Sequence, residues 1–263
     1  MSAEPLYLSR ARLRTERGEA LSALAPVLLM GSKGDTVSHA HRILWMLFQN
    51  KAESEGRDFL WREERPGHYL ILSRDPPDNR GDLFALESKD FAPNLRAGDL
   101  LSFALRANPV VSRKQGWEAG KEKRDRKGRV RGMRCDIVMD ALSPLGGFGG
   151  SRDEEGRTER AQKRDEATAA AALNWMRAQG KRCGFKLAVN PESDAPYLKA
   201  SNYETISIPR IKGTAFQPPA KFGVLDFEGI IEVTDPGLFL GQLARGFGKA
   251  KAFGCGLMLI RRA

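Results

Sequence analysis

The stretch that decides the fold reads LDFEGIIEVTDPGLFL, residues 225–240, and it contains one strand followed at once by one helix. In its first nine residues apolar side chains alternate with acidic ones, which is typical of a half-buried strand. Asp235 and Pro236 then mark a helix start, because aspartate caps free backbone N–H groups and proline fits the first turn. A glycine-rich turn and a last strand, Leu257–Ile260, complete a strand–helix–strand order.

Upstream of this stretch, a similar order of elements is predicted. Glu166–Gln179 is an alanine-rich helix that ends at Gly180, and strand-like segments follow at Phe185–Val189 and Tyr203–Ile211. The second half of the chain therefore alternates strands with two helices, which is the split βαβ arrangement.

The first half gives a similar order. A helix is predicted at Thr36–Phe48, with Asp35 or Thr36 as its N-cap. Strands are predicted at Leu6–Leu13, Asp58–Glu64, His68–Ser73 and Leu101–Ala107. Residues 74–98 are too rich in Pro, Asp and Gly to supply a second helix. The predicted fold class is α+β, with two tandem ferredoxin-like domains of the RRM-like, split βαβ kind.

Three regions are expected along the chain. Residues 1–112 form the first ferredoxin-like domain, with the helix described above, and residues 166–263 form the second, with the glycine-rich loop. Residues 113–165 are predicted to be a basic connector followed by a flexible insertion, because Ser143–Asp165 combines clustered glycines with mixed charges.

Composition narrows the class of protein. The 263 residues are enough for two small cores, and no apolar run approaches the ~18 to 20 residues that a membrane helix needs. The three cysteines, Cys135, Cys183 and Cys255, include no CxxC pair, so neither a disulfide framework nor a metal site is indicated. We expect a cytoplasmic protein with no cofactor, no metal and no membrane partner.

The net charge of +10 favours a polyanionic partner. Residues 113–134 carry ten basic side chains against three acidic ones, and five basic and no acidic residues follow Asp235. The first of these runs is either a nucleic-acid contact or a solvated, disordered connector.

The most distinctive segment is GFGKAKAFGCG, residues 246–256, in which Gly246, Gly248, Gly254 and Gly256 accompany Lys249 and Lys251. Glycines allow a backbone to approach a phosphodiester closely, and lysines neutralise its charge. The helix precedes the strand here, which excludes a dinucleotide-binding loop, and the glycine spacing excludes a P-loop. A tight connection that needs glycine only for its dihedral angles is the alternative.

Residues 246–260, GFGKAKAFGCGLMLI, resemble the C-terminal glycine-rich signature of the CasE-type CRISPR endoribonucleases of the type I-E Cascade complex. Other matches follow in the family's order, at Leu6–Ser9, His41–Phe48, Asp58–Arg62, Leu105–Pro109 and Phe227–Ile231. The resemblance implies two ferredoxin-like domains and an endonuclease that cuts the repeat stem-loop of CRISPR RNA. It also implies a protein that stays on its product beside other Cascade subunits, especially the backbone subunit.

The positions of the three histidines distinguish His41, the candidate catalytic residue, from His39 and His68. His39 and His41 point to nearly opposite sides of the predicted helix and cannot act together, and His39 and His68 are expected at the surface. From the residues alone His41 is a half-buried packing histidine, but the resemblance makes it the catalytic one. A position near the helix N-terminus would disfavour the imidazolium form. Ser38, one turn earlier, is a second catalytic candidate and stands where family members often carry a tyrosine; because a serine hydroxyl has a far higher pKa and a shorter reach, we do not expect it to be a full substitute.

Metal-independent RNA cleavage uses the adjacent 2′-OH as nucleophile, so a protein must move two protons and stabilise charge on phosphorus. The residues that we expect to contact RNA are basic or lie in the glycine-rich loop: Lys33, Arg42, Arg113, Lys114, Arg210, Lys212, Gly246, Gly248, Lys249, Lys251, Gly254 and Gly256. Each exposed cation is also compatible with a merely solvated side chain.

Two other classes stay open. One is an RNA-hairpin-binding subunit without catalysis, which the absence of the tyrosine leaves open. The other is an unrelated ferredoxin-like RNA-binding protein. Cleavage of a repeat hairpin in EDTA tests the first, and the position of the gene relative to CRISPR arrays tests the second.

Overall fold

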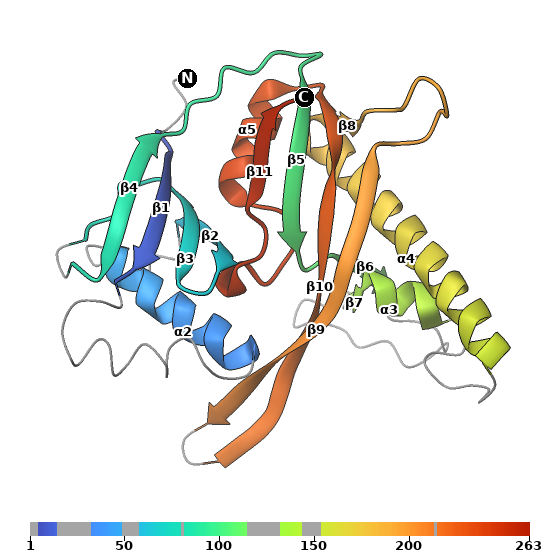
Figure 1. Ribbon diagram of the computed structural model, residues 1–263, viewed down its shortest axis with the longest axis horizontal. Coiled ribbons are helices and arrows are strands. Elements are labelled where there is room, and N and C mark those ends of the chain that lie inside the picture. The colour runs from blue at the N-terminus through green and yellow to red at the C-terminus, as the bar shows by residue number, and fades with distance from the viewer. Residues whose placement is uncertain are drawn as a thin grey trace.

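The computed structural model describes residues 5–14, 33–48, 58–79, 82–114, 132–143, 154–212 and 215–263. Two main antiparallel sheets stand side by side, and helices pack against each of them (Figure 1). The predicted α+β class with two ferredoxin-like units is confirmed by the strand order of both sheets.

The first sheet has the order β2-β3-β1-β4. Its strands are β1 (Tyr7–Leu13), β2 (Phe59–Arg65), β3 (His68–Ser73) and β4 (Phe84–Asp90). Helix α2 (Lys33–Trp45) and the short helix η1 (Met46–Phe48) bury their apolar face against this sheet, where Leu44 and Phe48 join Phe59, Trp61 and Tyr69. The sequence did not predict β4, because its outer residues are polar and exposed.

The second sheet has the order β11-β5-β10-β8, and β9 also pairs with β10. Its strands are β5 (Leu100–Ala107), β8 (Phe185–Leu187), β9 (Leu198–Lys212), β10 (Ala215–Val233) and β11 (Met258–Arg262). Helices α4 (Glu154–Cys183) and α5 (Pro236–Arg245) contribute to its core. As the sequence predicts, the Asp235 side chain caps α5 by accepting from the Leu238 N–H at 2.9 Å.

The strand at Leu101–Ala107 belongs to the second sheet, which corrects the domain boundary expected at residue 112. β5 pairs with β10, so that Leu105 lies opposite Phe227, and with β11 on its other side. The two units therefore meet between β4 and β5. Alternation of apolar residues identified the strand, but it carries no information about the strand's partner.

The expected connector, residues 113–165, contains regular structure. β6 (Val110–Lys114) pairs with β7 (Gly132–Asp136), and residues 115–131 between them lie outside the described part. Helix α3 (Ile137–Leu142) follows at once, because Asp136 caps it by accepting from the Val138 and Met139 N–H groups. Helix α4 begins at Glu154, twelve residues before the predicted start at Glu166.

The two units pack directly against each other. Leu60 and Leu72 of the first sheet form an apolar cluster with Leu257, just before β11. Helix α2 also contacts β9, the strand that forms a long hairpin with β10 (Figure 1). The glycine-rich segment of residues 246–256 lies at this junction, since Gly246 abuts Leu60 and Gly254 abuts Trp61. Among the described helices, none is both long and apolar enough to cross a membrane.

Candidate active site

The structure brings His41 against the glycine-rich loop. His41 lies on α2, and its ring centroid is 6.4 Å from that of Phe253, at the end of the short helix η4 (Lys251–Phe253) inside the loop. Phe253 in turn stacks on Phe222 of β10, with ring centroids 5.4 Å apart. Two segments more than 200 residues apart in the sequence, both singled out from the sequence, thus meet at one place.

A hydrogen bond from Trp45 orients the His41 ring. The indole Nε1 donates to Nε2 of His41 at 3.1 Å. Because an indole N–H can only donate, Nε2 must be the unprotonated nitrogen, and the neutral ring then carries its proton on Nδ1. Trp45 is itself fixed by edge-to-face packing on Phe59, with ring centroids 5.3 Å apart. The bond therefore selects one neutral tautomer of His41.

The position of His41 along α2 corrects an expectation from the sequence. The helix begins at Lys33, before the predicted caps Asp35 and Thr36, so His41 is the ninth of thirteen residues. The helix dipole acts mainly within the first and last turns. The neutral form of His41 is therefore favoured by Trp45, through its hydrogen bond, and the N-terminal dipole does not contribute.

Backbone hydrogen bonds clamp the glycine-rich loop to β5. The N–H of Lys249 donates to the carbonyl of Asn108 at 3.0 Å, and the N–H of Gly256 donates to the carbonyl of Arg106 at 2.8 Å. Gly248 has a φ of +73°, and a Cβ there would lie 2.6 Å from the Asn108 oxygen. Backbone conformation alone thus explains this glycine. Ala250, between the two lysines, is held in the left-handed region at φ +52°, where alanine is strained.

The two loop lysines differ in their surroundings. Lys251 is half-buried, and its Nζ donates to the carbonyl of Arg245, the last residue of α5. It therefore compensates the negative end of that helix. Lys249 is exposed. Both side chains, together with Gly246 and Gly248, line one cavity of about 490 Å³.

The other predicted RNA-contacting residues are dispersed. Arg113 forms an ion pair with Asp140 of α3, with Nε 3.0 Å from the carboxylate, which reduces its availability to a phosphate. Arg42 is exposed in the last turn of α2. The positions of Lys33, Lys114, Arg210 and Lys212 lie on α2, β6 and β9, but their side chains are outside the described part.

A crevice of about 220 Å³ lies between the units, beside α2. Val37 of α2 and Phe253 of the loop form two of its walls. Arg106, which also lines it, is paired with Glu204 and lies 3.1 Å from Asp226, so its charge is compensated. Next to this cluster, burial raises the pKa of the Cys255 thiol to about 12, which keeps the thiol protonated and unreactive at neutral pH.

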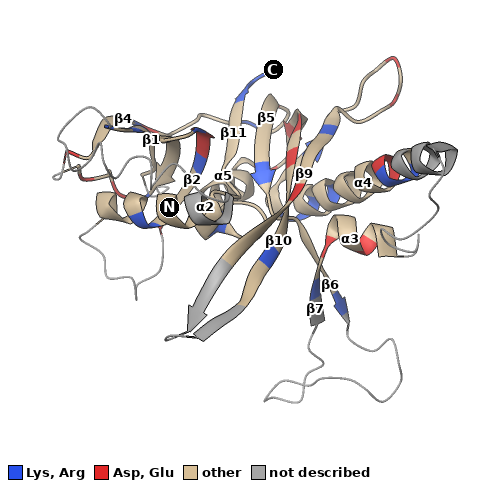
Figure 2. Ribbon diagram, turned by 60° about the horizontal axis from the view of Figure 1, so that its bottom comes forward, with Lys and Arg blue, Asp and Glu red and all other residues tan. Residues whose placement is uncertain are grey.

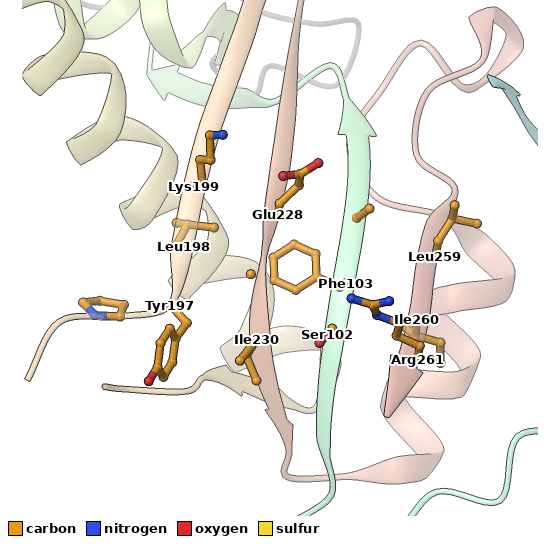
Figure 3. Close-up of a pocket in the computed structure, with 13 residues that line it drawn as sticks. Ser102, Phe103, Tyr197, Leu198, Lys199, Glu228, Ile230, Leu259, Ile260 and Arg261 are labelled. Atoms are coloured by element: carbon orange, nitrogen blue, oxygen red, sulfur yellow. The ribbon is translucent and has the colours of Figure 1, made fainter. Parts of the chain in front are cut away.

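A third concavity, of about 730 Å³, crosses the face of the second sheet (Figure 3). Lys199, Glu228 and Arg261 point into it between apolar side chains such as Ile230 and Leu259. Its mixture of charges does not favour a polyanion. Among the described residues, no three His, Cys, Asp or Glu side chains gather closely enough to hold a metal ion.

The other two histidines differ from expectation. His39 is half-buried, and its Nδ1 has no hydrogen-bond partner among the described residues, so it is not a surface residue. His68 is half-buried in the β2–β3 hairpin, with Nδ1 3.1 Å from the Pro66 carbonyl oxygen.

Sequence reasoning missed the residues that support the site. The i, i+4 spacing of His41 and Trp45 was a usable signal, because side chains four apart on a helix are neighbours. The hydrogen bonds of Asn108 had no such signal, because its partners are 115 and 141 residues away along the chain.

The fold and the site define a class of protein, in which two tandem ferredoxin-like units hold a histidine against a lysine-bearing, glycine-rich loop. The chain belongs to the family described as CRISPR associated protein, whose model matches residues 6–262. The family expected from the sequence is thereby confirmed.

Individual relatives agree with this assignment. The chain is 21% identical over 240 residues to the CRISPR system Cascade subunit CasE of Escherichia coli (strain K12), covering 89% of this chain and 96% of the relative. Among solved structures, the CRISPR endoribonuclease Cse3 bound to a 19 nt RNA aligns with a TM-score of 0.61 and 22% identity, over 99% of this chain and 100% of that one. Thermus thermophilus Cse3 bound to an RNA representing a pre-cleavage complex aligns with a TM-score of 0.59 and 22% identity, over 98% and 99% of the two chains.

Proposed function

We propose that this protein is an endoribonuclease that cuts the repeat stem-loop of CRISPR precursor RNA and remains bound to its product within a Cascade complex. The observation that carries the proposal is the contact between His41 and the glycine-rich loop, in a chain that the family matches along almost its whole length. The relatives named as a Cascade subunit and as RNA-bound endoribonucleases support the substrate class and the partners.

The proposed reaction needs no metal ion. The 2′-OH of the nucleotide before the cut attacks the adjacent phosphorus, and the bond from phosphorus to the 5′-oxygen breaks. The attacking hydroxyl loses its proton, the leaving oxygen gains one, and the products end in a 2′,3′-cyclic phosphate and a 5′-OH. His41 serves as the base or the acid for one of these transfers. Because Nε2 accepts from Trp45, the transfer is assigned to the other ring nitrogen, Nδ1.

Charge stabilisation is assigned to the glycine-rich loop. Phosphorus gains negative charge in the transition state, and a positioned cation lowers the barrier. Lys249 is exposed, and its backbone is fixed next to the end of β5 through the Asn108 carbonyl, so the base of its side chain is positioned before RNA binds.

The test uses a radiolabelled hairpin of the CRISPR repeat encoded beside the gene, incubated with excess protein in EDTA. We expect one cut, with product masses that show a cyclic phosphate and a 5′-OH. A 2′-deoxy nucleotide at the cut should abolish cleavage, and His41→Ala should slow it ~10² to 10⁴-fold without loss of binding. His68→Ala is the matched control, because His68 lies in the β2–β3 hairpin.

A second function, RNA-hairpin binding without cleavage, is favoured by one observation. Ser38 is half-buried one turn before His41, where the family often has tyrosine, and a serine hydroxyl is a much weaker acid. Tight binding of the hairpin without any cut in EDTA or in Mg²⁺ would establish this function and exclude the nuclease.

A further inference from the structure

The cavity of about 490 Å³ lies where four elements meet. The β6–β7 ribbon, the end of α4, helix α5 and the glycine-rich loop all contribute walls, so its residues come from positions up to 141 apart in the sequence. The residues that line it are Val110, Ser112, Arg134, Trp175, Gln179, Arg182, Cys183, Gln242, Gly246, Gly248, Lys249 and Lys251. We call it the basic cavity.

Its charge is of one sign. Arg134, Arg182, Lys249 and Lys251 line the basic cavity, and no carboxylate is among its lining residues. The crevice beside α2 differs, because its lining contains two arginines and two glutamates. The concavity on the second sheet, shown in Figure 3, combines two cations with Glu228. Four like charges around one concavity repel one another, and a bound polyanion relieves that repulsion.

Two of the four cations, Arg182 and Lys251, are held by hydrogen bonds to backbone carbonyls before any ligand arrives. Arg182 donates its Nε–H to the Ala178 carbonyl at 3.2 Å, which leaves its terminal N–H groups for other acceptors. Lys251 is tied to the end of α5 through the Arg245 carbonyl. Gln242 is fixed by donating to the Gly246 carbonyl at 2.7 Å. An arginine such as Arg182 can bind phosphate through two parallel hydrogen bonds from its guanidinium group.

The glycine-rich loop is a wall shared by two spaces. Lys249 and Lys251 line the basic cavity, whereas Phe253 and Gly254 line the crevice beside α2. His41 contacts the same Phe253. A single strand of RNA that crosses the loop would therefore touch the basic cavity within a few nucleotides of the catalytic histidine.

We propose, resting on the proposed function, that the basic cavity binds the RNA backbone beside the glycine-rich loop, with Arg134 and Arg182 as direct phosphate ligands. Neither arginine belongs to the loop or to the catalytic helix. Their role is to hold an RNA segment next to the cut, and the chemical step does not depend on them once the RNA is bound.

The first experiment measures hairpin affinity at several salt concentrations for the double variant Arg134→Gln, Arg182→Gln. We expect at least a tenfold loss of affinity, because both arginines lose their charged hydrogen bonds to phosphate. The slope of log K against log salt should flatten by about one to two units. The single-turnover cleavage rate at saturating protein should stay at the wild-type value.

The control removes two positive charges from the same helix outside the cavity. Arg177 and Lys181 are exposed on α4 and do not line the basic cavity, and Lys181 is the direct neighbour of Arg182. The variant Arg177→Gln, Lys181→Gln should lose less than threefold in affinity. Equal losses in the two double variants would show a diffuse charge effect and would overturn the proposal.

The second experiment locates the phosphate. Single uncharged methylphosphonates are placed in turn along the RNA on both sides of the cut. One or two positions should weaken binding to the wild type tenfold, yet have no effect on the Arg134→Gln, Arg182→Gln variant. Absence of any such position would overturn the proposal. An unchanged RNA affinity of the arginine variant would also overturn it, and that result is expected if an acidic protein segment occupies the cavity.

The nuclease activity and the RNA-binding role of the basic cavity can be refuted separately. A wild type that binds the hairpin without cutting it refutes the nuclease, while the affinity measurements still test the cavity. A wild type that cuts normally, together with an arginine variant of unchanged affinity and salt dependence, refutes only the cavity.

Discussion

Trp45 donates its indole N–H to Nε2 of His41 at 3.1 Å, across one turn of the same helix. This bond exists only while Nε2 is unprotonated, so it stabilises neutral His41 relative to the imidazolium. Trp45→Phe keeps the packing on Phe59 and removes the donor. We expect the limb of the pH–rate profile that His41 controls, acidic for a base and basic for an acid, to move to higher pH by up to about one unit, because a net hydrogen bond is worth ~0.5–1.5 kcal/mol.

The measurement is the single-turnover rate between pH 5 and pH 9 at saturating protein. RNA affinity at neutral pH should not change in Trp45→Phe. A loss of rate that is the same at every pH would instead show that Trp45 only shapes the helix.

Ser38 should make a small contribution to catalysis. Its hydroxyl is one turn from His41 but has a pKa far too high for an efficient proton donor at neutral pH. We expect Ser38→Ala to slow the single-turnover rate by less than about tenfold, against the much larger loss in His41→Ala. Ser38→Tyr restores the residue that the family often has, and it should cleave at least as fast as the wild type. A hundredfold loss in Ser38→Ala would make the serine a catalytic residue.

Replacement of Lys249 and of Lys251 should have different effects on the free energy of unfolding. Lys251 donates to the Arg245 carbonyl at the end of α5, and a cation at a helix C-terminus is worth about 0.3–1 kcal/mol. Lys251→Ala should lower the free energy of unfolding in urea by about that amount, whereas Lys249→Ala should leave it unchanged. Both variants should bind the hairpin more weakly, and equal stability of the two would contradict the capping role of Lys251.

Asn108 should be a positioning residue for the glycine-rich loop. Asn108 is 5% exposed, and its side-chain amide donates to the Gly223 carbonyl at 2.6 Å. Its backbone carbonyl accepts from the Lys249 N–H. Asn108→Ala removes the donor of a buried hydrogen bond and should cost about 1–3 kcal/mol of unfolding free energy.

Cleavage by Asn108→Ala should also slow at saturating protein, because a shift of ~1 Å at a reacting group can cost about a hundredfold. Asn94→Ala, at an exposed position, is the control for both measurements. Loss of stability without any change in cleavage would show a structural role only.

Glu63 gives a dependence of stability on pH whose sign follows from its environment. Burial raises the pKa of its carboxyl above 4.5, although the Gly67 N–H and the Tyr69 hydroxyl oppose the shift through hydrogen bonds. A raised pKa in the folded state favours folding in acid, and this contribution is lost as the pH rises through the folded pKa. Glu63→Gln should therefore be more stable than the wild type at pH 7, and the difference should shrink towards pH 4. A constant difference in urea unfolding across this range would contradict the shift.

The sequence by itself determined several of the elements and the family. Alternation over residues 225–233 specified the last part of β10, Asp235 and Pro236 specified the start of α5, and the glycine-rich segment specified the class of protein. These signals are local, because side-chain periodicity and capping act over a few residues. His41 was selected by resemblance, since its local pattern is also that of a packing residue.

Only the tertiary structure decided which elements become neighbours. It placed β5 in the second sheet, paired β6 with β7 across the basic run, and brought Phe253 to His41 and Arg134 to Arg182. Strand pairing depends on the fit between apolar faces that are distant in the sequence, and a basic residue carries the same charge whether it faces water or a cavity. The charges were evident from the sequence, but their convergence on one cavity followed from the packing of α4, α5 and the glycine-rich loop.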